Sequence, residues 1–251
     1  MQPPTVALVL PPPPPIDVAG HALFIDFDGT LVPIAERPDD VFADPALIDL
    51  LERLEARFGD RLTIVSGRSV EQLDAMIGPL AARLSLIGSH GAEIRRHGKL
   101  RQPPPAIGLA PATRDVEMFA AKHPGLIVEH KSLGVALHYR AACDLAGLAI
   151  EAAGAIAAAH GLMVQPGKMM IELRGPGCDK GSALATLMAG PSLRHCRPVM
   201  IGDDLTDEPA FVLVETIGGF GILVGAGRET AASFRLPDVA ALRDWLSQVA
   251  A

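Results

Sequence analysis

Short apolar runs alternate with segments of helical periodicity along most of the chain. Four of these runs have the length of a strand, at residues 21–26, 62–65, 84–87 and 198–201. Between them, apolar residues recur every three or four positions, which is typical of amphipathic helices. This alternation predicts a parallel sheet covered by helices, with ligands bound at the carboxyl ends of the strands.

The helical segments between the strands carry start and stop signals. Pro45–Arg57 has a proline at its start and Gly59 beyond its end. Ser69–Ile77 begins with Ser69 as the expected N-cap, and Gln72 occupies the capping-box position. A further helix and a further strand are predicted at residues 180–188 and 221–224.

Residues 108–174 break this rhythm and are interpreted as an inserted domain. Its pattern predicts helices at residues 111–122 and 145–160, each followed by a hairpin, at 126–140 and 162–174. We therefore expect an α+β cap at 108–174 and a core formed by residues 21–107 and 175–251. Residues 1–20 contain five consecutive prolines and are expected to form a loose, extended leader.

The two predicted hairpins of the insertion separate charged from apolar residues. Pairing Lys131 with Ala136 places charged side chains on one face of the sheet and apolar side chains on the other. The charged set consists of Glu129, Lys131, His138, Arg140, Lys168 and Glu172. A solvated sheet face has this pattern, and so does a face that binds a polyhydroxylated ligand.

Two acidic clusters follow predicted strands. Asp26 and Asp28 end the first strand, and Gly29 allows the chain to turn, so two carboxylates lie beside one reacting centre. An ordinary Asp-Gly turn would have the same sequence. The second cluster, Gly202–Glu208, follows the apolar run 198–201. Two acidic strand ends in one sheet suggest a shared cation.

Composition narrows the class of protein. The 251 residues are 49% hydrophobic and carry a net charge of −7, and no basic run exceeds two residues, so a nucleic-acid partner is not expected. Cys143, Cys178 and Cys196 are widely spaced, which fits free thiols in a reducing compartment. The apolar stretch Val6–Leu10 is too short for a signal sequence. We expect a cytoplasmic monomer without membrane contact.

The motifs together resemble a known family. Four of them, in order, resemble the haloacid dehalogenase superfamily of phosphotransferases: Asp26–Thr30, Ser66–Arg68, Lys180 and Gly202–Glu208. Five segments resemble the trehalose-6-phosphate phosphatase family more narrowly: Ser66–Ser69, His90–Glu93, Ala136–Arg140, Gly167–Glu172 and Asp203–Glu208. The resemblance extends from His21 to Leu246. It implies a Rossmann-like core with an inserted cap, and hydrolysis of trehalose 6-phosphate to trehalose and phosphate.

The resemblance also implies roles for the acidic residues. Asp26 would be the nucleophile and form an aspartyl-phosphate. Asp28 would be the acid and base, with its backbone carbonyl facing the metal. A hard cation such as Mg²⁺ would let a carboxylate approach the phosphate dianion, with Asp203 as a direct ligand. Asp204 and Asp207 would hold metal-bound water or orient the site, although a capped, solvated loop explains both equally well.

The remaining motif residues are expected at the phosphate and the sugar. Ser66, with the adjacent Gly67 amide, and the ammonium of Lys180 would bind phosphoryl oxygens. Arg68, His90 and Glu93 follow strands at the same sheet edge, and they would reach the phosphate or the sugar. Loop scaffolding is the alternative for these three residues.

Three other functions are compatible with parts of this pattern. A non-catalytic sensor of sugar phosphates would be expected to lack Asp26 or Asp28, and both are present. A phosphosugar mutase would use the same aspartyl-phosphate but return the phosphoryl group to a sugar. Among hydrolases, a sucrose-6-phosphate or other sugar-phosphate phosphatase is the runner-up.

Overall fold

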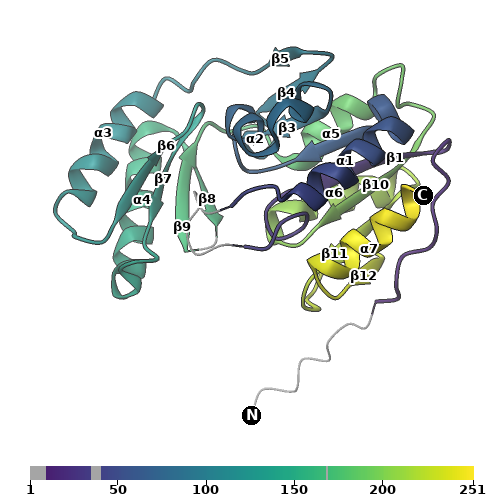
Figure 1. The fold of residues 1–251 in the computed structure, drawn as a ribbon. Coiled ribbons are helices and arrows are strands. Elements are labelled where there is room, and N and C mark those ends of the chain that lie inside the picture. The colour runs from purple at the N-terminus through teal and green to yellow at the C-terminus, as the bar shows by residue number, and fades with distance from the viewer. Residues whose placement is uncertain (1–9, 35–40, 168) are drawn as a thin grey trace. The chain divides into compact units, whose positions relative to one another are not determined.

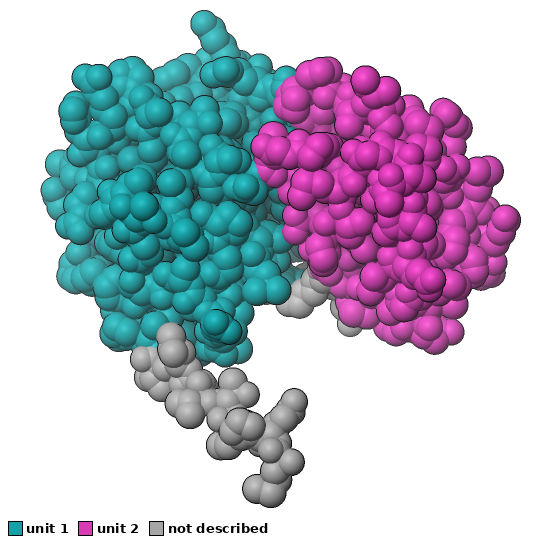
Figure 2. Space-filling view, turned by 180° about the vertical axis from the view of Figure 1, so that it is seen from behind, with its two compact units in different colours: residues 1–102, 179–251 teal, residues 103–178 magenta. Residues whose placement is uncertain are grey.

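The computed structural model describes residues 10–34, 41–167 and 169–251, and it contains two compact units (Figures 1 and 2). One unit consists of the residues up to Gln102 together with Asp179–Ala251. The other is Pro103–Cys178, inserted between the two parts of the first. We call them the core and the cap. At both ends the cap extends a few residues beyond the predicted 108–174.

The core is built on an eight-stranded sheet with the order β12-β11-β10-β1-β2-β3-β4-β5. From β12 to β3 neighbouring strands are parallel, and β4 and β5 continue the sheet in antiparallel pairs. Since β1 lies between β10 and β2, the residues that follow these three strands meet at one edge. The strands are β1 His21–Asp26, β2 Leu62–Val65, β3 Ser85–Gly88, β4 Glu93–Arg96, β5 Lys99–Arg101, β10 Arg197–Gly202, β11 Phe220–Val224 and β12 Phe234–Leu236.

Helices cover both faces of this sheet (Figure 1). Strand β1 shows why, because Leu23 and Ile25 belong to one hydrophobic cluster and Phe24 belongs to the other. The first cluster contains residues of α1 (Pro45–Phe58), α2 (Val70–Ile77) and α7 (Val239–Val249). The second contains residues of α5 (Lys180–Met188) and α6 (Glu208–Thr216). This arrangement confirms the predicted α/β class.

The sequence pattern missed the antiparallel edge of the core sheet. It predicted a loop from Gly88 to Glu93, whereas Glu93 begins β4, which pairs with β3 and then with β5. The β4 sequence Glu-Ile-Arg-Arg and the β5 sequence Lys-Leu-Arg each contain one apolar residue. Strands this short and polar have no hydrophobic periodicity from which to predict them.

The cap is a four-stranded sheet covered by two helices. Its strand order is β6-β7-β9-β8, with all pairs antiparallel. The strands are β6 Ile127–His130, β7 Gly134–His138, β8 Met163–Gly167 and β9 Met170–Arg174, and the helices are α3 Leu109–Ala120 and α4 Ala146–His160. Val135, Leu137 and Leu173 form a separate hydrophobic cluster with apolar residues of both helices. The cap therefore has its own core.

The first cap hairpin has a different register from the predicted one. Glu129, rather than Lys131, pairs with Ala136. The shift is two residues, and because side chains alternate with a period of two, each residue keeps its predicted face. The pairing of Ala136 with Glu172 places the charged residues of β9 on the same face.

Helix α4 is part of the segment Cys143–His160, which by length and composition alone could cross a membrane. Such a segment is weak evidence for a membrane span. In the cap, Ala149, Ala153 and Ala157 of this helix belong to the hydrophobic cluster that covers the sheet. The small alanine side chains allow the helix to lie close to the strands.

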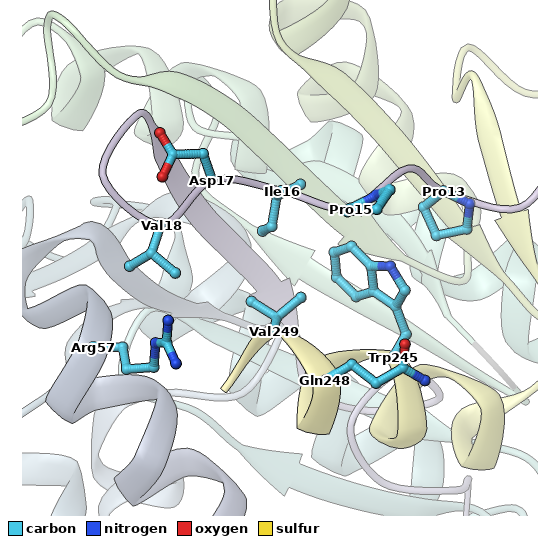
Figure 3. Close-up of a pocket in the computed structure, with 9 residues that line it drawn as sticks. All are labelled: Pro13, Pro15, Ile16, Asp17, Val18, Arg57, Trp245, Gln248 and Val249. Carbon is cyan, nitrogen blue, oxygen red and sulfur yellow. The ribbon is translucent and has the colours of Figure 1, made fainter. Parts of the chain in front are cut away.

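The described part of the proline-rich leader packs against the core, in contrast to the loose leader predicted. The backbone N–H of Arg235 in β12 donates to the carbonyl oxygen of Pro11 (3.0 Å). Pro13 and Pro15 line a pocket with Trp245 of α7 (Figure 3). Extended polyproline leaves its carbonyl groups free to accept hydrogen bonds, and its flat rings pack well on an indole. The described residues of the leader therefore lie beside β12, at one edge of the core sheet.

Removing residues 1–15 is expected to shift the fluorescence emission of Trp245 to longer wavelength, because its indole would lose proline rings and gain water. Trp245 is the only tryptophan of the chain, so the emission maximum reports on this contact directly. The full chain and the truncated chain should emit identically in denaturant. An unchanged native emission maximum would contradict the packing of the leader.

Candidate active site

Asp26, at the end of β1, is buried beside a lysine. The Nζ atom of Lys180 lies 2.7 Å from Oδ1 of Asp26 and 2.6 Å from Oδ1 of Asp207. All three side chains are at most 5% exposed. Lys180 is the first residue of α5, which follows the N-cap Asp179. The topology thus brings together residues from three distant parts of the chain.

Close backbone packing brings the second acidic cluster to the first. Gly29 has a φ of +86°, and a Cβ atom on it would lie 2.2–2.7 Å from the carboxylate atoms of Asp203. Thr30 Oγ1 donates to Asp203 Oδ1 at 3.4 Å. Position 29 therefore requires glycine both for its backbone angle and for the space that Asp203 occupies.

The buried side chain of Asp207 holds the backbone of the second acidic loop, Gly202–Glu208. Its Oδ2 accepts the backbone N–H groups of Asp203 (3.0 Å) and Asp204 (3.1 Å), and its side chain is fully buried. Asp204 is exposed, and its Oδ1 accepts the N–H of Thr206 as the cap of a short turn. The structure thus supports an orienting role for Asp207 and a capping role for Asp204.

The charges of this cluster suit a divalent cation. Carboxylate oxygens of Asp26, Asp203 and Asp207 lie within 4.8 Å of one another. Burial raises the pKa of Asp26 and of Asp207 above its usual range, although Lys180 opposes this rise. Burial also disfavours the ammonium of Lys180, but the two carboxylates outweigh it and raise its pKa. A group of hard oxygen donors with surplus negative charge fits an ion such as Mg²⁺.

Asp28 lies beside Arg68 of the loop after β2. Nε of Arg68 contacts both carboxylate oxygens of Asp28 (2.8 and 3.0 Å), and Nη2 donates to Oδ1 at 2.7 Å. Ser66 Oγ lies 3.4 Å from Oδ2 of the same carboxylate. Arg68 and Ser66 therefore orient Asp28, which explains their position next to the acidic motif.

The loops after β2 and β3 are joined by backbone hydrogen bonds. The N–H of Ser89 donates to the carbonyl of Arg68 (2.7 Å), and that of His90 donates to the carbonyl of Ser66 (3.1 Å). Ser89 and His90 both have positive φ values, a strained conformation that is common at functional sites. The ring of His90 lies where a Cβ atom of Gly67 would be. His90 is thus packed on the predicted phosphate loop.

Glu93 supports the end of the loop after β2, where α2 begins. It is 2% exposed, and its Oε2 accepts the N–H of Val70, the first residue of α2, at 2.6 Å. A carboxylate is favourable at a helix N-terminus. The scaffolding alternative therefore fits Glu93 better than direct contact with a substrate.

On the charged face of the cap sheet, four of the six predicted residues lie in two pairs. Lys131 Nζ lies 2.5 Å from Glu172 Oε2, and His138 Nε2 lies 2.8 Å from Glu129 Oε2. Arg140 follows the end of β7 in a turn. Lys168 lies outside the described residues.

The sequence analysis missed Arg228, in the loop between β11 and β12. Its Nη2 atom donates to the carbonyl oxygen of Asp204 at 2.7 Å, and it pairs with Glu208. Arg228 follows Gly225-Ala226-Gly227, a short pattern that predicts a turn but no partner for it. Only the parallel pairing of β10 with β11 brings this loop to the site.

Asp26→Asn is expected to raise the melting temperature of the metal-free protein at neutral pH by a few degrees. The pKa of Asp26 is raised on folding, so the folded state binds the proton more tightly and loses stability as pH rises from about 4 through the raised pKa. Asparagine does not ionise, so the difference between variant and wild type should vanish toward pH 4. Melting curves in a chelator at several pH values measure this.

Asp49→Asn is the matched control, because Asp49 is exposed on α1 and pairs only with Arg53 in the contacts described. Its substitution should give no such pH-dependent gain. If the Asp26→Asn protein were less stable than wild type at neutral pH, burial of the charged Asp26 carboxylate would not be destabilising, and the prediction would be wrong.

The comparisons with known proteins agree with this geometry. The family model described as trehalose-phosphatase matches residues 24–240. The trehalose-6-phosphate phosphatase of Escherichia coli (strain K12) is 36% identical over 239 residues, covering 92% of this chain and 87% of that protein. A probable trehalose-phosphate phosphatase of Sinorhizobium fredii is 33% identical over 249 residues, covering 93% and 89%.

Solved structures give the same result. A trehalose-6-phosphate phosphatase related protein, 32% identical, has a TM-score of 0.79 and matches over 91% of this chain and 96% of that chain. A phosphatase of the HAD superfamily from Bacteroides thetaiotaomicron, 16% identical with a TM-score of 0.61, shares the fold over 91% and 94% of the two chains. The chain therefore belongs to the trehalose-phosphatase family and has the fold of the haloacid dehalogenase superfamily.

Proposed function

We propose that this protein is a Mg²⁺-dependent phosphatase that hydrolyses trehalose 6-phosphate to trehalose and inorganic phosphate, as a step of trehalose biosynthesis. The observation that carries the proposal is the buried Asp26 carboxylate, held by Lys180 and adjacent to Asp203, in a chain of this family. We further propose that it acts as a monomer in the cytoplasm, with no nucleic-acid or membrane partner.

The reaction uses the two carboxylates in sequence. An oxygen of Asp26 attacks phosphorus, a P–O bond to Asp26 forms, and the bond between phosphorus and the sugar oxygen breaks. Asp28 gives a proton to that oxygen, so trehalose leaves. Asp28 then takes a proton from water, whose oxygen attacks the phosphoryl group and releases phosphate from Asp26.

Positive charge and loop geometry support the first step. Lys180 offsets the combined negative charge of Asp26 and the phosphate. Ser66 and the Gly67 amide bind phosphoryl oxygens, with Arg68 and His90 beside them. Bound Mg²⁺ would supply further positive charge against the repulsion between two anions. Asp26, the backbone carbonyl of Asp28 and Asp203 would hold it.

The charged face of the cap would supply specificity for the disaccharide. Its carboxylates, ammonium and imidazole are hydrogen-bonding groups suited to sugar hydroxyls. The pairs Lys131–Glu172 and His138–Glu129 fix these groups on one sheet face. Arg140 and Lys168 are proposed to complete the set. In this scheme the core performs the chemistry and the cap selects the leaving group.

Release of free phosphate from a panel of sugar phosphates tests the function. We expect trehalose 6-phosphate to have the highest kcat/KM and activity to disappear in a chelator and return with Mg²⁺. A higher kcat/KM for sucrose 6-phosphate would mean that sucrose 6-phosphate, and not trehalose 6-phosphate, is the substrate. Transfer to a sugar without free phosphate would indicate a mutase, and binding without turnover would indicate a sensor. Asp26→Asn is the control for contaminating phosphatases, because an amide cannot be the nucleophile.

Substituting either partner of the Lys131–Glu172 pair is expected to lower kcat/KM for trehalose 6-phosphate by about one to three decades. This corresponds to about 1–4 kcal/mol for a lost charge-assisted contact and its unpaired partner. Lys131→Met and Glu172→Gln keep the size of the side chains. Hydrolysis of a small aryl phosphate, whose leaving group lacks sugar hydroxyls, should change much less.

The pair His160–Asp115, which joins α4 to α3 in the cap, provides the matched control. His160→Gln changes a hydrogen-bonded contact of the same domain outside the charged sheet face, and the ratio of the two activities should stay constant. Equal losses on both substrates in the Lys131 and Glu172 variants would refute recognition by this face.

A further inference from the structure

Arg228, in the loop between β11 and β12, contacts the second acidic loop. Nη2 of Arg228 donates to the carbonyl oxygen of Asp204 at 2.7 Å, and Nη1 donates to the carbonyl of Glu229 at 2.9 Å. The guanidinium also pairs with Oε1 of Glu208, at the start of α6. The other oxygen of Glu208 accepts the N–H of Ala231 at 2.8 Å. These contacts form one connected network around the acidic loop.

This network differs from an ordinary surface ion pair. The side chains of Arg228 and Glu208 are 24% and 23% exposed, so both are largely removed from water. Exposed pairs contribute little because their side chains are mobile and screened. Here each charged group also holds backbone atoms, and the planar guanidinium has a fixed fork of donors. The network is therefore suited to fixing backbone geometry.

Two side chains hold the backbone of the acidic loop. Buried Asp207 accepts the N–H groups of Asp203 and Asp204. Arg228 holds a second atom of the same residue, the carbonyl oxygen of Asp204. Asp203, directly before Asp204, packs its carboxylate against Gly29 and lies within 4.8 Å of Asp26. Because Asp203 is the neighbour of Asp204 in the chain, a displacement of the Asp204 backbone would displace Asp203 as well.

We propose that Arg228 is a positioning residue for the divalent-cation site: by fixing the Asp204 carbonyl, it keeps the Asp203 carboxylate beside Asp26. This inference rests on the proposed function, which places a cation between these two aspartates. Arg228 touches neither the cation nor the substrate. It acts through the backbone of the loop.

Charge and positioning predict effects of opposite sign when Arg228 is removed. A guanidinium near the site repels a cation, so loss of its charge alone would tighten cation binding. Loss of positioning would weaken it, by about 10–100-fold for a group that orients a metal ligand. The sign of the change therefore identifies the role without reference to activity.

Binding of Mn²⁺ to the full chain, followed by electron paramagnetic resonance of the free ion, measures this sign. We expect Arg228→Ala to raise the dissociation constant about 10–100-fold. Arg228→Lys keeps the charge but loses the fork, so it should also bind Mn²⁺ more weakly than wild type. Melting curves without metal confirm that each variant is folded.

Arg197→Ala is the matched control. The Nε atom of Arg197 donates to the carbonyl of Gly218 at 3.0 Å, but Arg197 begins β10, at the end opposite to the acidic loop. Its loss should leave Mn²⁺ affinity unchanged. Unchanged or tighter binding by Arg228→Ala would overturn the inference while the cation site stands. If wild type bound no Mn²⁺, or if Asp203→Asn bound it equally well, the cation site and the inference would fall together.

Discussion

The buried ammonium of Lys180 is the interaction on which the site depends. Burying the carboxylates of Asp26 and Asp207 near each other is costly, because burial disfavours each charge and each repels the other. Lys180 contacts both, and its charge offsets part of this cost. An unpaired buried lysine would itself be strongly destabilising. Lys180 therefore depends on a carboxylate partner, and both buried carboxylates depend on Lys180.

Parallel topology explains why the site can form from distant parts of the sequence. β1, β2 and β10 end at the same edge, so residues 26, 66 and 203 meet although more than a hundred residues separate the last from the other two. The glycines at 29 and 202 then let carboxylates occupy the space of a side chain. Strand direction brings the segments together, and the missing Cβ atoms determine how closely they approach.

The sequence was sufficient for the parts of the fold with strong periodicity or a short motif. The central strands, the capped helices and the inserted α+β segment follow from local patterns, and the acidic strand ends marked Asp26 and Asp203. The motif at 90–93 marked Glu93 but left open whether it contacts the substrate or supports a loop, and its hydrogen bond to the Val70 N–H favours support. Arg228 did not follow from the sequence, because it acts on a backbone atom of another loop. The packing of the leader was also missed, because a proline run has the same sequence pattern whether it is solvated or packed against a tryptophan.

The two-residue shift in the first cap hairpin has an evolutionary consequence. Because the strands of the cap carry charge on one face and form a core with the other, β6 can slide along β7 only in even steps. A turn lengthened by one residue would turn Glu129 toward α3, which packs on β6, and would expose Val128. Changes in the length of this turn are therefore expected in steps of two residues, because an odd step would turn Glu129 away from His138 of the neighbouring strand.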